Sequence, residues 1–241
     1  MPAFKGVIFD LFHTLTARES QWSDVPATWS LLGVDRYDWD RAMLQSSRWR
    51  LVGEERDPYV IFRRLVSLCD ASIPDDRVRE VLVRRTQRFT ECFQRVPAEN
   101  VGMLKRLRAS GYKLALLSNA DAMEVTAYAA GNLQGLFDVE VFSCDAGHVK
   151  PEPEIFHSCL EALQLPASEC VFVGDGGSDE LQGAQAVGLR TILVSGVIEE
   201  LFPERLPERI AVADRHVKWA HEVDGLIENW APACRGVTPH G

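Results

Sequence analysis

Short apolar runs rich in β-branched side chains recur along the chain. They lie at residues 6–10, 113–118, 139–143, 170–175 and 191–195, with a weaker run at 210–214. Continuous apolar character without alternation is typical of strands buried on both faces, so these runs predict a parallel sheet. Helical patterns separate the later runs, at residues 101–109, 122–130, 154–163 and 180–187. The alternation predicts an α/β fold with a doubly wound, Rossmann-like parallel sheet.

One long gap interrupts this alternation. Residues 14–112 separate the first two predicted strands, although a crossover connection needs only about a dozen residues. Residues 17–95 have polar, helical patterns and no convincing strand. We therefore expect a helical cap domain at 17–95, inserted into a core domain of residues 1–16 and 96–241. Four tryptophans are expected to fill the small core of this insert, namely Trp22, Trp29, Trp39 and Trp49.

Composition and charge narrow the class of partner. The chain has 241 residues and a formal net charge of −9, from 26 Lys and Arg against 35 Asp and Glu. This balance argues against nucleic acid, because proteins that bind phosphate backbones carry a basic excess. No stretch approaches the ~18 consecutive apolar residues of a membrane span, and the first ten residues lack a signal-peptide layout. Six cysteines without a C-x-x-C pair suggest reduced thiols. We expect a cytoplasmic monomer or homodimer that acts on a small molecule.

Chemically reactive side chains follow the ends of four predicted strands. They are Asp10 after the first strand, Ser118 and Asn119 after the second, Lys150 after the third, and Asp175 and Asp179 after the fourth. Ligands of open α/β sheets bind beyond the carboxyl ends of the strands, so we expect these side chains to converge. Buried carboxylates are costly unless they are paired or bind metal. Lys150 supplies one counter-charge, and Mg²⁺ is the natural second.

Four segments at these strand ends follow one another in a known order. They are VIFDLFHTLT, LLSNA, KPEPEIF and VGDGGSDELQGAQAVG. Together they resemble the four core motifs of the haloacid dehalogenase-like hydrolase superfamily. In that family a small helical cap is inserted between the first and second motifs, which is where the long gap lies in this chain.

The resemblance implies a catalytic role for each matching residue. Asp10 would be the nucleophile, attacking phosphorus to form an aspartyl-phosphate. Thr14 and Ser118 would hold the transferring oxygens, and the backbone N–H of Asn119 would add a donor. Lys150 would neutralise the nucleophile and the phosphoryl group.

The resemblance also implies a metal site and a reaction class. Mg²⁺ would be bound by the carboxylates of Asp10, Asp175 and Asp179 and by the backbone carbonyl of Phe12. Positioning and charge stabilisation of this kind are what phosphoryl transfer mainly requires. The predicted function is therefore a Mg²⁺-dependent phosphatase of a small phosphorylated metabolite.

Phe12 departs from the pattern of the family's phosphatases, which usually carry a second Asp there as general acid and base. The loss of such a group typically costs about 10²–10⁴-fold in rate. The leaving group could need no acid, another group could supply the proton, or the enzyme could attack carbon as a metal-independent 2-haloacid dehalogenase. A binding or regulatory protein with little turnover is a further alternative. Asp175 favours the metal-dependent phosphatase, because a carboxylate at that position makes little sense without a cation.

Two further residues are candidates for substrate binding. His13 could replace the missing acid, and Arg50 could bind an anionic part of the substrate where the cap meets the core. Other cap arginines, Arg84, Arg85 and Arg88, are expected on an exposed helix face.

Overall fold

A parallel sheet of six strands forms the centre of the molecule. In this computed structural model, which describes residues 4–45 and 47–230, the strand order is β3-β2-β1-β4-β5-β6. The strands are β1 (Gly6–Phe9), β2 (Lys113–Ser118), β3 (Val139–Phe142), β4 (Cys170–Gly174), β5 (Arg190–Val194) and β6 (Arg215–Val217). Every neighbouring pair is parallel, and Ile8 of β1 lies between Ala115 and Phe172. The predicted doubly wound, Rossmann-like α/β fold is confirmed.

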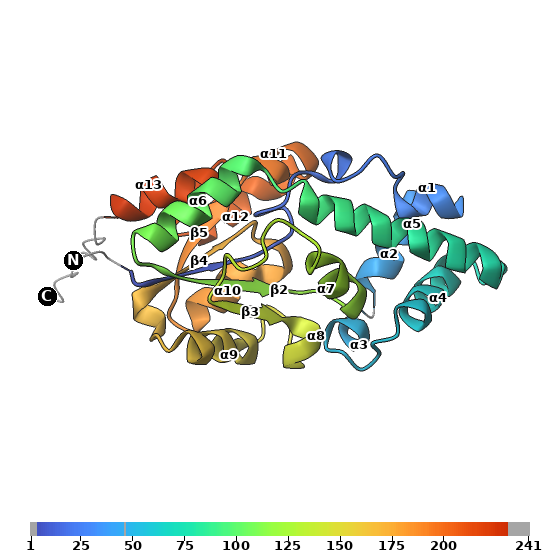
Figure 1. The fold of residues 1–241 in the computed structure, drawn as a ribbon, viewed down its shortest axis with the longest axis horizontal. Helices are drawn as coiled ribbons and strands as arrows, with labels where there is room; N and C mark the ends of the chain where they lie inside the picture. Colours follow the sequence, from blue (N-terminus) through green and yellow to red (C-terminus); the bar gives the residue numbers. More distant parts are fainter. Residues whose placement is uncertain (1–3, 46, 231–241) are drawn as a thin grey trace, which may run out of the picture.

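Helices cover both faces of the sheet (Figure 1). One face is packed by α6 (Ala98–Ala109) and α13 (Val223–Glu228), and the other by α9 (Pro153–Leu163) and α10 (Glu180–Ala186). Val7 and Phe9 of β1 point into the first hydrophobic cluster, whereas Ile8 points into the second. This burial on both sides explains the continuous apolar strand runs.

The remaining elements connect these layers or follow the strand ends. They are α7 (Ala122–Tyr128), α8 (Ser143–Ala146), α11 (Gly196–Leu201), α12 (Leu206–Val212) and short 3-10 helices at Glu19–Gln21, Ala167–Glu169, Gly177–Asp179, Pro203–Arg205 and Ala220–Glu222.

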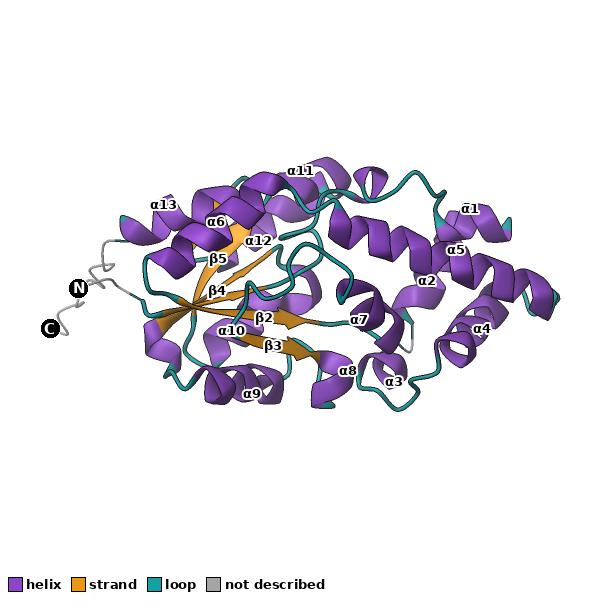
Figure 2. Ribbon diagram, in the orientation of Figure 1, coloured by secondary structure: helices purple, strands orange, loops and turns teal. Residues whose placement is uncertain are grey.

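The connection between β1 and β2 forms a group of helices beyond the carboxyl ends of the strands (Figure 2). These insert helices are α1 (Thr28–Leu32), α2 (Arg36–Leu44), α3 (Arg48–Leu51), α4 (Pro58–Cys69) and α5 (Asp75–Gln94). Between 17 and 95 the described residues hold no strand, as predicted. The long helix α5 packs on α1, on α4 and on α7, so it links the insert to the strand ends. The domain division at residues 16 and 95 stays a prediction.

Local sequence signals set the ends of the insert helices. The Asp57 side chain accepts hydrogen bonds from the backbone N–H groups of Tyr59 and Val60, and Pro58 occupies the first position of α4. Both features are preferred at helix starts. Gly33 ends α1 in the left-handed conformation, with φ of 72°, which glycine adopts without a Cβ penalty.

The insert has its own hydrophobic cluster, which includes three of the four tryptophans. Trp39 and Trp49 are buried within it, and Trp29 packs against its edge. Trp22 belongs instead to the larger cluster under α6, where its ring lies 5.8 Å from that of Phe12. The prediction is wrong for Trp22, because this residue precedes α1 and lies against the loop that follows β1.

The sixth strand lies further along the chain than predicted. Residues 210–214 do not form a strand, since α12 continues to Val212 and β6 begins at Arg215. Pro207 in the first turn favours a helix start in this segment. β6 lies at the edge of the sheet, and two of its three residues are exposed. An exposed edge strand needs no apolar run, so the hydrophobic pattern could not locate it.

Two further expectations concern cysteines and membranes. Among the described residues, Cys69, Cys92, Cys144, Cys159 and Cys170 are unpaired thiols, and Cys234 lies outside this part of the chain. Within residues 4–45 and 47–230, none of the helices combines the length and the apolar character needed to cross a membrane.

The buried ring of Phe62 should carry much of the stability of the insert. Phe62 is 1% exposed and lies 6.0 Å from the ring of Trp39. We expect Phe62→Ala to lower the free energy of unfolding by about 3–5 kcal/mol, because it leaves a cavity in this cluster. Tyr37, which is 72% exposed in α2, provides a matched control as Tyr37→Ala. Urea titration of both variants is the measurement. An equal loss of unfolding free energy in the two variants would contradict the role of Phe62 in stabilising the insert.

Candidate active site

Asp10 lies directly after β1 at the carboxyl edge of the sheet. Its backbone N–H donates to the carbonyl of Val173 in β4, at 2.8 Å, which holds the residue in place between two central strands. Its carboxylate is 8% exposed and accepts two hydrogen bonds. The Thr14 hydroxyl donates to Oδ2 at 2.8 Å, and the Lys150 ammonium donates to Oδ1 at 2.6 Å. The structure therefore brings together three of the predicted residues.

Lys150 is buried between two carboxylates. Its Nζ lies 2.6 Å from Asp10 Oδ1 and 2.6 Å from Glu180 Oε2. Burial alone would lower the pKa of Lys150, but these two carboxylates outweigh burial and hold the pKa above its ordinary value. The Asn119 side chain fixes the lysine backbone: its Nδ2 donates to the Lys150 carbonyl at 3.0 Å, and its Oδ1 accepts from the Lys150 N–H at 2.8 Å. Lys150 is thus a fixed, charged group.

The loop after β4 and the start of α10 hold two further carboxylates. The backbone N–H of Gly177 donates to Asp175 Oδ1 at 2.8 Å, and that of Gly176 donates to Glu180 Oε1 at 3.0 Å. A Cβ atom at Gly174 would lie 2.2 Å from Glu180 Oε1, so only glycine leaves room for this carboxylate. Arg209 donates to the Asp175 carbonyl at 2.7 Å. Backbone and arginine donors therefore orient both acids.

Asp10, Asp175 and Glu180 form one buried acidic group. Each offers a carboxylate oxygen, and these oxygens lie within 4.8 Å of one another. Burial raises the pKa of Asp10, with Lys150 opposing this effect and Asp175 adding to it. Burial also raises the pKa of Glu180 well above its ordinary value. Lys150 contacts Asp10 and Glu180, and Arg209 Nη1 lies 3.4 Å from Asp175 Oδ2, so two cationic side chains face three carboxylates. A divalent cation that prefers oxygen ligands would offset the remaining negative charge.

Glu180 replaces Asp179 in this acidic group. The predicted metal ligand Asp179 is exposed, with φ of 51°, and lies outside the group. Glu180 begins α10 and is buried on the same helical face as Gly183 and Ala184. The spacing of three and four residues on that face was the available signal, because buried helical positions recur at this interval.

Ser118 and Asn119 occupy the end of β2, as predicted. Ser118 is 0% exposed, and its hydroxyl has no hydrogen-bond partner among the described residues. An unpaired buried hydroxyl is costly, so this group is suited to bind a ligand oxygen. The Asn119 side chain instead positions Lys150, a contact that the sequence pattern did not indicate.

Phe12 and His13 lie side by side in the loop after β1 but have different surroundings. The Phe12 ring packs against aromatic rings, including Trp22 at 5.8 Å and Phe93 at 5.7 Å. His13 has its Nδ1 atom 3.9 Å from Asp175 Oδ2. Burial alone would lower the pKa of His13, but nearby carboxylates, with Glu19 first, hold it above its ordinary value. Phe12 is thus an apolar packing residue, and His13 lies beside the acidic group.

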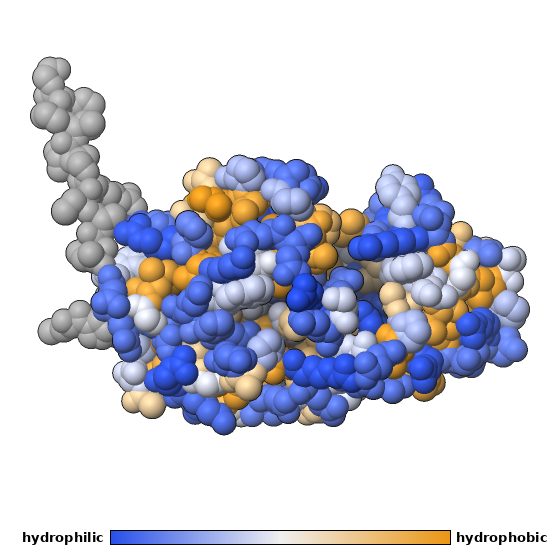
Figure 3. All heavy atoms as spheres, turned by 90° about the horizontal axis from the view of Figure 1, so that it is seen from above, coloured by the Kyte–Doolittle hydropathy of each residue, from blue (hydrophilic) through white to orange (hydrophobic). Residues whose placement is uncertain are grey.

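A cavity of about 630 Å³ lies between the insert helices and the strand ends. Phe12, His13 and Asn119 line it on the side of the sheet, and residues of α2, α3 and α5 line it on the side of the insert. The molecular surface is hollowed between these two parts (Figure 3). Most pockets that bind small molecules fall in this size range.

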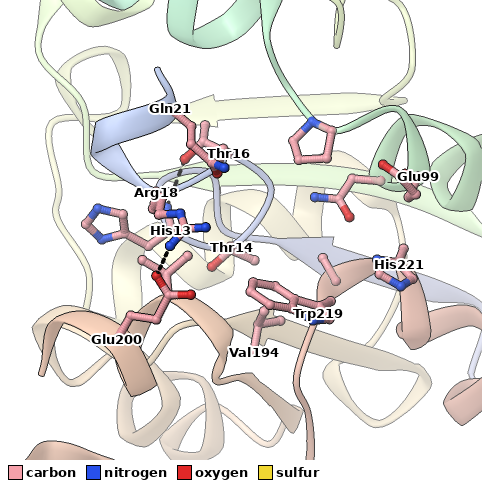
Figure 4. Close-up of a pocket in the computed structure, with 15 residues that line it drawn as sticks. His13, Thr14, Thr16, Arg18, Gln21, Glu99, Val194, Glu200, Trp219 and His221 are labelled. Atoms are coloured by element: carbon pink, nitrogen blue, oxygen red, sulfur yellow. Dashed lines mark hydrogen bonds and ion pairs between the residues drawn. The ribbon is translucent and has the colours of Figure 1, made fainter. Parts of the chain in front are cut away.

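A second cavity, of about 360 Å³, lies near the same loop (Figure 4). Thr14 lines it together with Val194 and Trp219, and the ion pair of Arg18 with Glu200 lies at its border. His13 lines both cavities. The loop after β1 therefore borders two separate openings, while the Thr14 hydroxyl remains bound to Asp10.

Arg50 joins α3 to the start of α7. Its Nη1 donates to Asp121 Oδ2 at 2.8 Å, and its Nη2 donates to the Met43 carbonyl at 3.1 Å. The Asp121 carboxylate also caps α7 by accepting from the backbone N–H of Met123 and Glu124. Arg50 also lines the larger cavity. Its contact with substrate stays a prediction.

Two arginines of α5 are buried, contrary to expectation. Arg85 is 5% exposed and Arg88 is 9% exposed, and both line the larger cavity, whereas Arg84 is exposed. Arg85 lies between Val81 and Phe89 on the buried stripe of α5, since residues four apart share a helix face. This apolar stripe was the signal that could have identified Arg85 from the sequence.

Comparisons with known proteins agree with the motifs. The sequence model of a haloacid dehalogenase-like hydrolase matches residues 4–188. Haloacid dehalogenase-like hydrolase domain-containing protein 3 of Bos taurus is 36% identical over 93 residues, which are 39% of this chain and 37% of that protein. Pyrophosphatase PpaX of Bacillus mycoides is 32% identical over 97 residues, or 40% of this chain and 45% of that protein. The chain thus matches well under two thirds of each relative.

Solved structures agree with the fold. The L-2-haloacid dehalogenase from Xanthobacter autotrophicus superposes with a TM-score of 0.70 and 21% identity, covering 95% of this chain and 100% of that chain. A structure titled as a dehalogenase gives a TM-score of 0.71 at 20% identity, over the same shares of the two chains. At this identity the similarity concerns the fold alone.

Removal of the Lys150 ammonium should expose the electrostatic strain of the acidic group. We expect Lys150→Met to lower the free energy of unfolding by about 3–5 kcal/mol at neutral pH without added metal, because it leaves buried carboxylates unpaired. Lys105→Met, on the exposed side of α6, should change it by less than about 0.5 kcal/mol. Urea titration provides both values, and a Lys150 effect as small as the control would contradict this interpretation.

Proposed function

The chain belongs to the haloacid dehalogenase-like hydrolase family, and we propose that it is a Mg²⁺-dependent phosphatase of a small phosphorylated molecule. The observation that carries the proposal is the buried group of three carboxylates, two of which contact Lys150. A hydrolase that needed no cation would have little use for Asp175 and Glu180 beside its nucleophile. One relative, named as a pyrophosphatase, supports chemistry at phosphorus.

In this proposal Asp10 is the nucleophile. One carboxylate oxygen forms a bond to phosphorus while the bond from phosphorus to the leaving oxygen breaks, which gives an aspartyl-phosphate. Lys150 and Thr14 already contact the two carboxylate oxygens and fix the direction of attack. The unpaired hydroxyl of Ser118 would donate to a phosphoryl oxygen. Water then cleaves the new bond to phosphorus and restores Asp10.

The donor set fits Mg²⁺, a hard cation that takes few carboxylates and keeps several waters. Asp10, Asp175 and Glu180 would hold it, together with the backbone carbonyl of Phe12. When bound, the ion would neutralise charge on the phosphoryl oxygens. The insert helices would act as a cap that excludes water and contacts the rest of the substrate.

Phe12 bears on the leaving group. Its ring is packed among other aromatic rings and moves no proton, so we expect esters with good leaving groups to react fastest. The same observation favours a second candidate function, dehalogenation of a 2-haloacid, in which halide leaves without a proton. There Asp10 would attack carbon, and the reaction would need no metal.

A metal-dependence assay separates these two functions. We expect release of phosphate from p-nitrophenyl phosphate, loss of that activity in excess chelator and its return with Mg²⁺, because the carboxylates repel the substrate without a cation. Halide release from 2-chloropropionate should be undetectable. Undiminished phosphate release in chelator, or halide release in its presence, would instead favour the metal-independent reaction.

Three acid variants test the residue assignment. Asp10→Asn should reduce turnover of p-nitrophenyl phosphate at least about 10³-fold, because it removes the nucleophile. Glu180→Gln should also be strongly impaired and should need more Mg²⁺ for half-maximal activity. Asp179→Asn is the matched control, since this acid is exposed and outside the acidic group. Equal impairment of the Glu180 and Asp179 variants would contradict the assignment of Glu180.

A further inference from the structure

The larger cavity has three buried arginines in its wall, together with the acids Glu19, Asp40 and Glu124. Arg50, Arg85 and Arg88 line it and are each less than a tenth exposed. Fully buried arginines are rare unless they are paired. What each guanidinium contacts therefore shows where positive charge remains available to a ligand.

Two of these arginines are occupied by the protein. Arg50 forms its ion pair with Asp121 at 2.8 Å. Arg88 donates to two backbone carbonyls, those of Val25 at 2.7 Å and Glu19 at 2.6 Å. These contacts hold both side chains in fixed structural roles.

Arg85 is less well paired. Its Nη1 donates to the Thr28 hydroxyl at 3.1 Å, and the carboxylate oxygen of Glu124 lies 3.8 Å from Nη2, beyond hydrogen-bond distance. Burial lowers the pKa of Arg85 even though Glu124 and Asp121 act to raise it. Nη2 also donates to the weak acceptor Met43 Sδ at 3.9 Å. An arginine has five N–H donors, so these contacts leave part of its capacity unused.

Glu124 compensates Arg85 only in part. Its Oε2 already accepts from the backbone N–H of Asp121 at 2.9 Å. Burial, with Asp121 adding to it, raises the pKa of Glu124 to about 7. Burial and Asp121 thus disfavour the ionised form of Glu124, which weakens both its pairing with Arg85 and its repulsion of a nearby anion.

Aromatic rings hold the Arg85 guanidinium in place. Its central carbon lies 4.7 Å from the centroid of Phe89 and 5.5 Å from that of Trp39. Trp39 and Phe89 also line the cavity, together with Trp22. The wall near Arg85 thus combines a fixed positive charge with apolar faces, and these suit a flat or apolar molecule that ends in an anion.

We propose that Arg85 determines specificity by binding a second anionic group of the substrate, a carboxylate or a phosphate, on the side of the cavity away from Asp10. The substrate class is then a phosphomonoester whose apolar or aromatic body carries this second anion. The cavity supports this reading, because Asn119 and Phe12 line its other side, beside the strand ends that carry the catalytic groups. This inference rests on the proposed phosphatase function only for the phosphate group that Asp10 would attack. The contact of Arg85 with the second anion does not depend on it.

Two matched esters test the proposal: phenyl phosphate and 4-carboxyphenyl phosphate, which differ only in the second anion. Dissociation constants are measured by calorimetry with Mg²⁺ in the Asp10→Asn background, and KM is measured in the active enzyme. The carboxylated ester should bind at least about tenfold more tightly, as expected for a charge-assisted hydrogen bond. Arg85→Met should abolish this preference. Arg84→Met, on the exposed side of the same helix, should retain it.

Every outcome of this experiment bears on the proposal. Equal affinity of the two esters in the Asp10→Asn background would overturn it, as would a preference that survives Arg85→Met. Arg85→Gln serves if the methionine variant does not fold, and it should also lose the preference because it lacks the charge. Failure of the active enzyme to hydrolyse either ester would refute the phosphatase function alone, since the binding preference is measured without turnover.

Discussion

The arrangement of the active site depends on one buried ammonium between two carboxylates. Lys150 contacts Asp10 and Glu180 at 2.6 Å each, and without it three acids would share a site from which water is largely excluded. The Asn119 side chain fixes the lysine backbone from the end of β2. Groups from the ends of β1, β2 and β4 therefore depend on one another, which explains why the chemistry lies where these central strands meet.

The insert completes this site from the other side. The ion pair of Arg50 with Asp121 attaches α3 to the start of α7, and α5 packs along α7. The cavity between the two parts has Arg85 in its wall along α5, and Phe12, His13 and Asn119 line it on the side of the strand ends. An acidic protein can accommodate an anion in such a cavity, because the local charges differ from the net charge of −9.

Much of the fold and part of the site could be predicted from the sequence. Strands buried on both faces have continuous apolar runs, and Asp10, Lys150 and Asp175 directly follow such runs or the loops between them. Glu180 shares a buried helix face with Gly183 and Ala184, which was the one signal for it in the sequence. The conformation of the glycine-rich loop decides which acid turns inward, and the sequence does not reveal that conformation. Arg85 was missed although it lies on the apolar stripe of α5, because a charged side chain is expected to be exposed. The edge strand β6 was missed because its exposed residues form no apolar run.

The central claim is that Asp10, held by Lys150, attacks phosphorus. Acid quenching during turnover of p-nitrophenyl phosphate with Mg²⁺, followed by mass spectrometry of the peptide that contains Asp10, tests it directly. The account predicts a phosphoryl group on Asp10 that is absent when Mg²⁺ is removed. Rapid release of phosphate while the Asp10 peptide stays unmodified and another residue carries the phosphoryl group would contradict it.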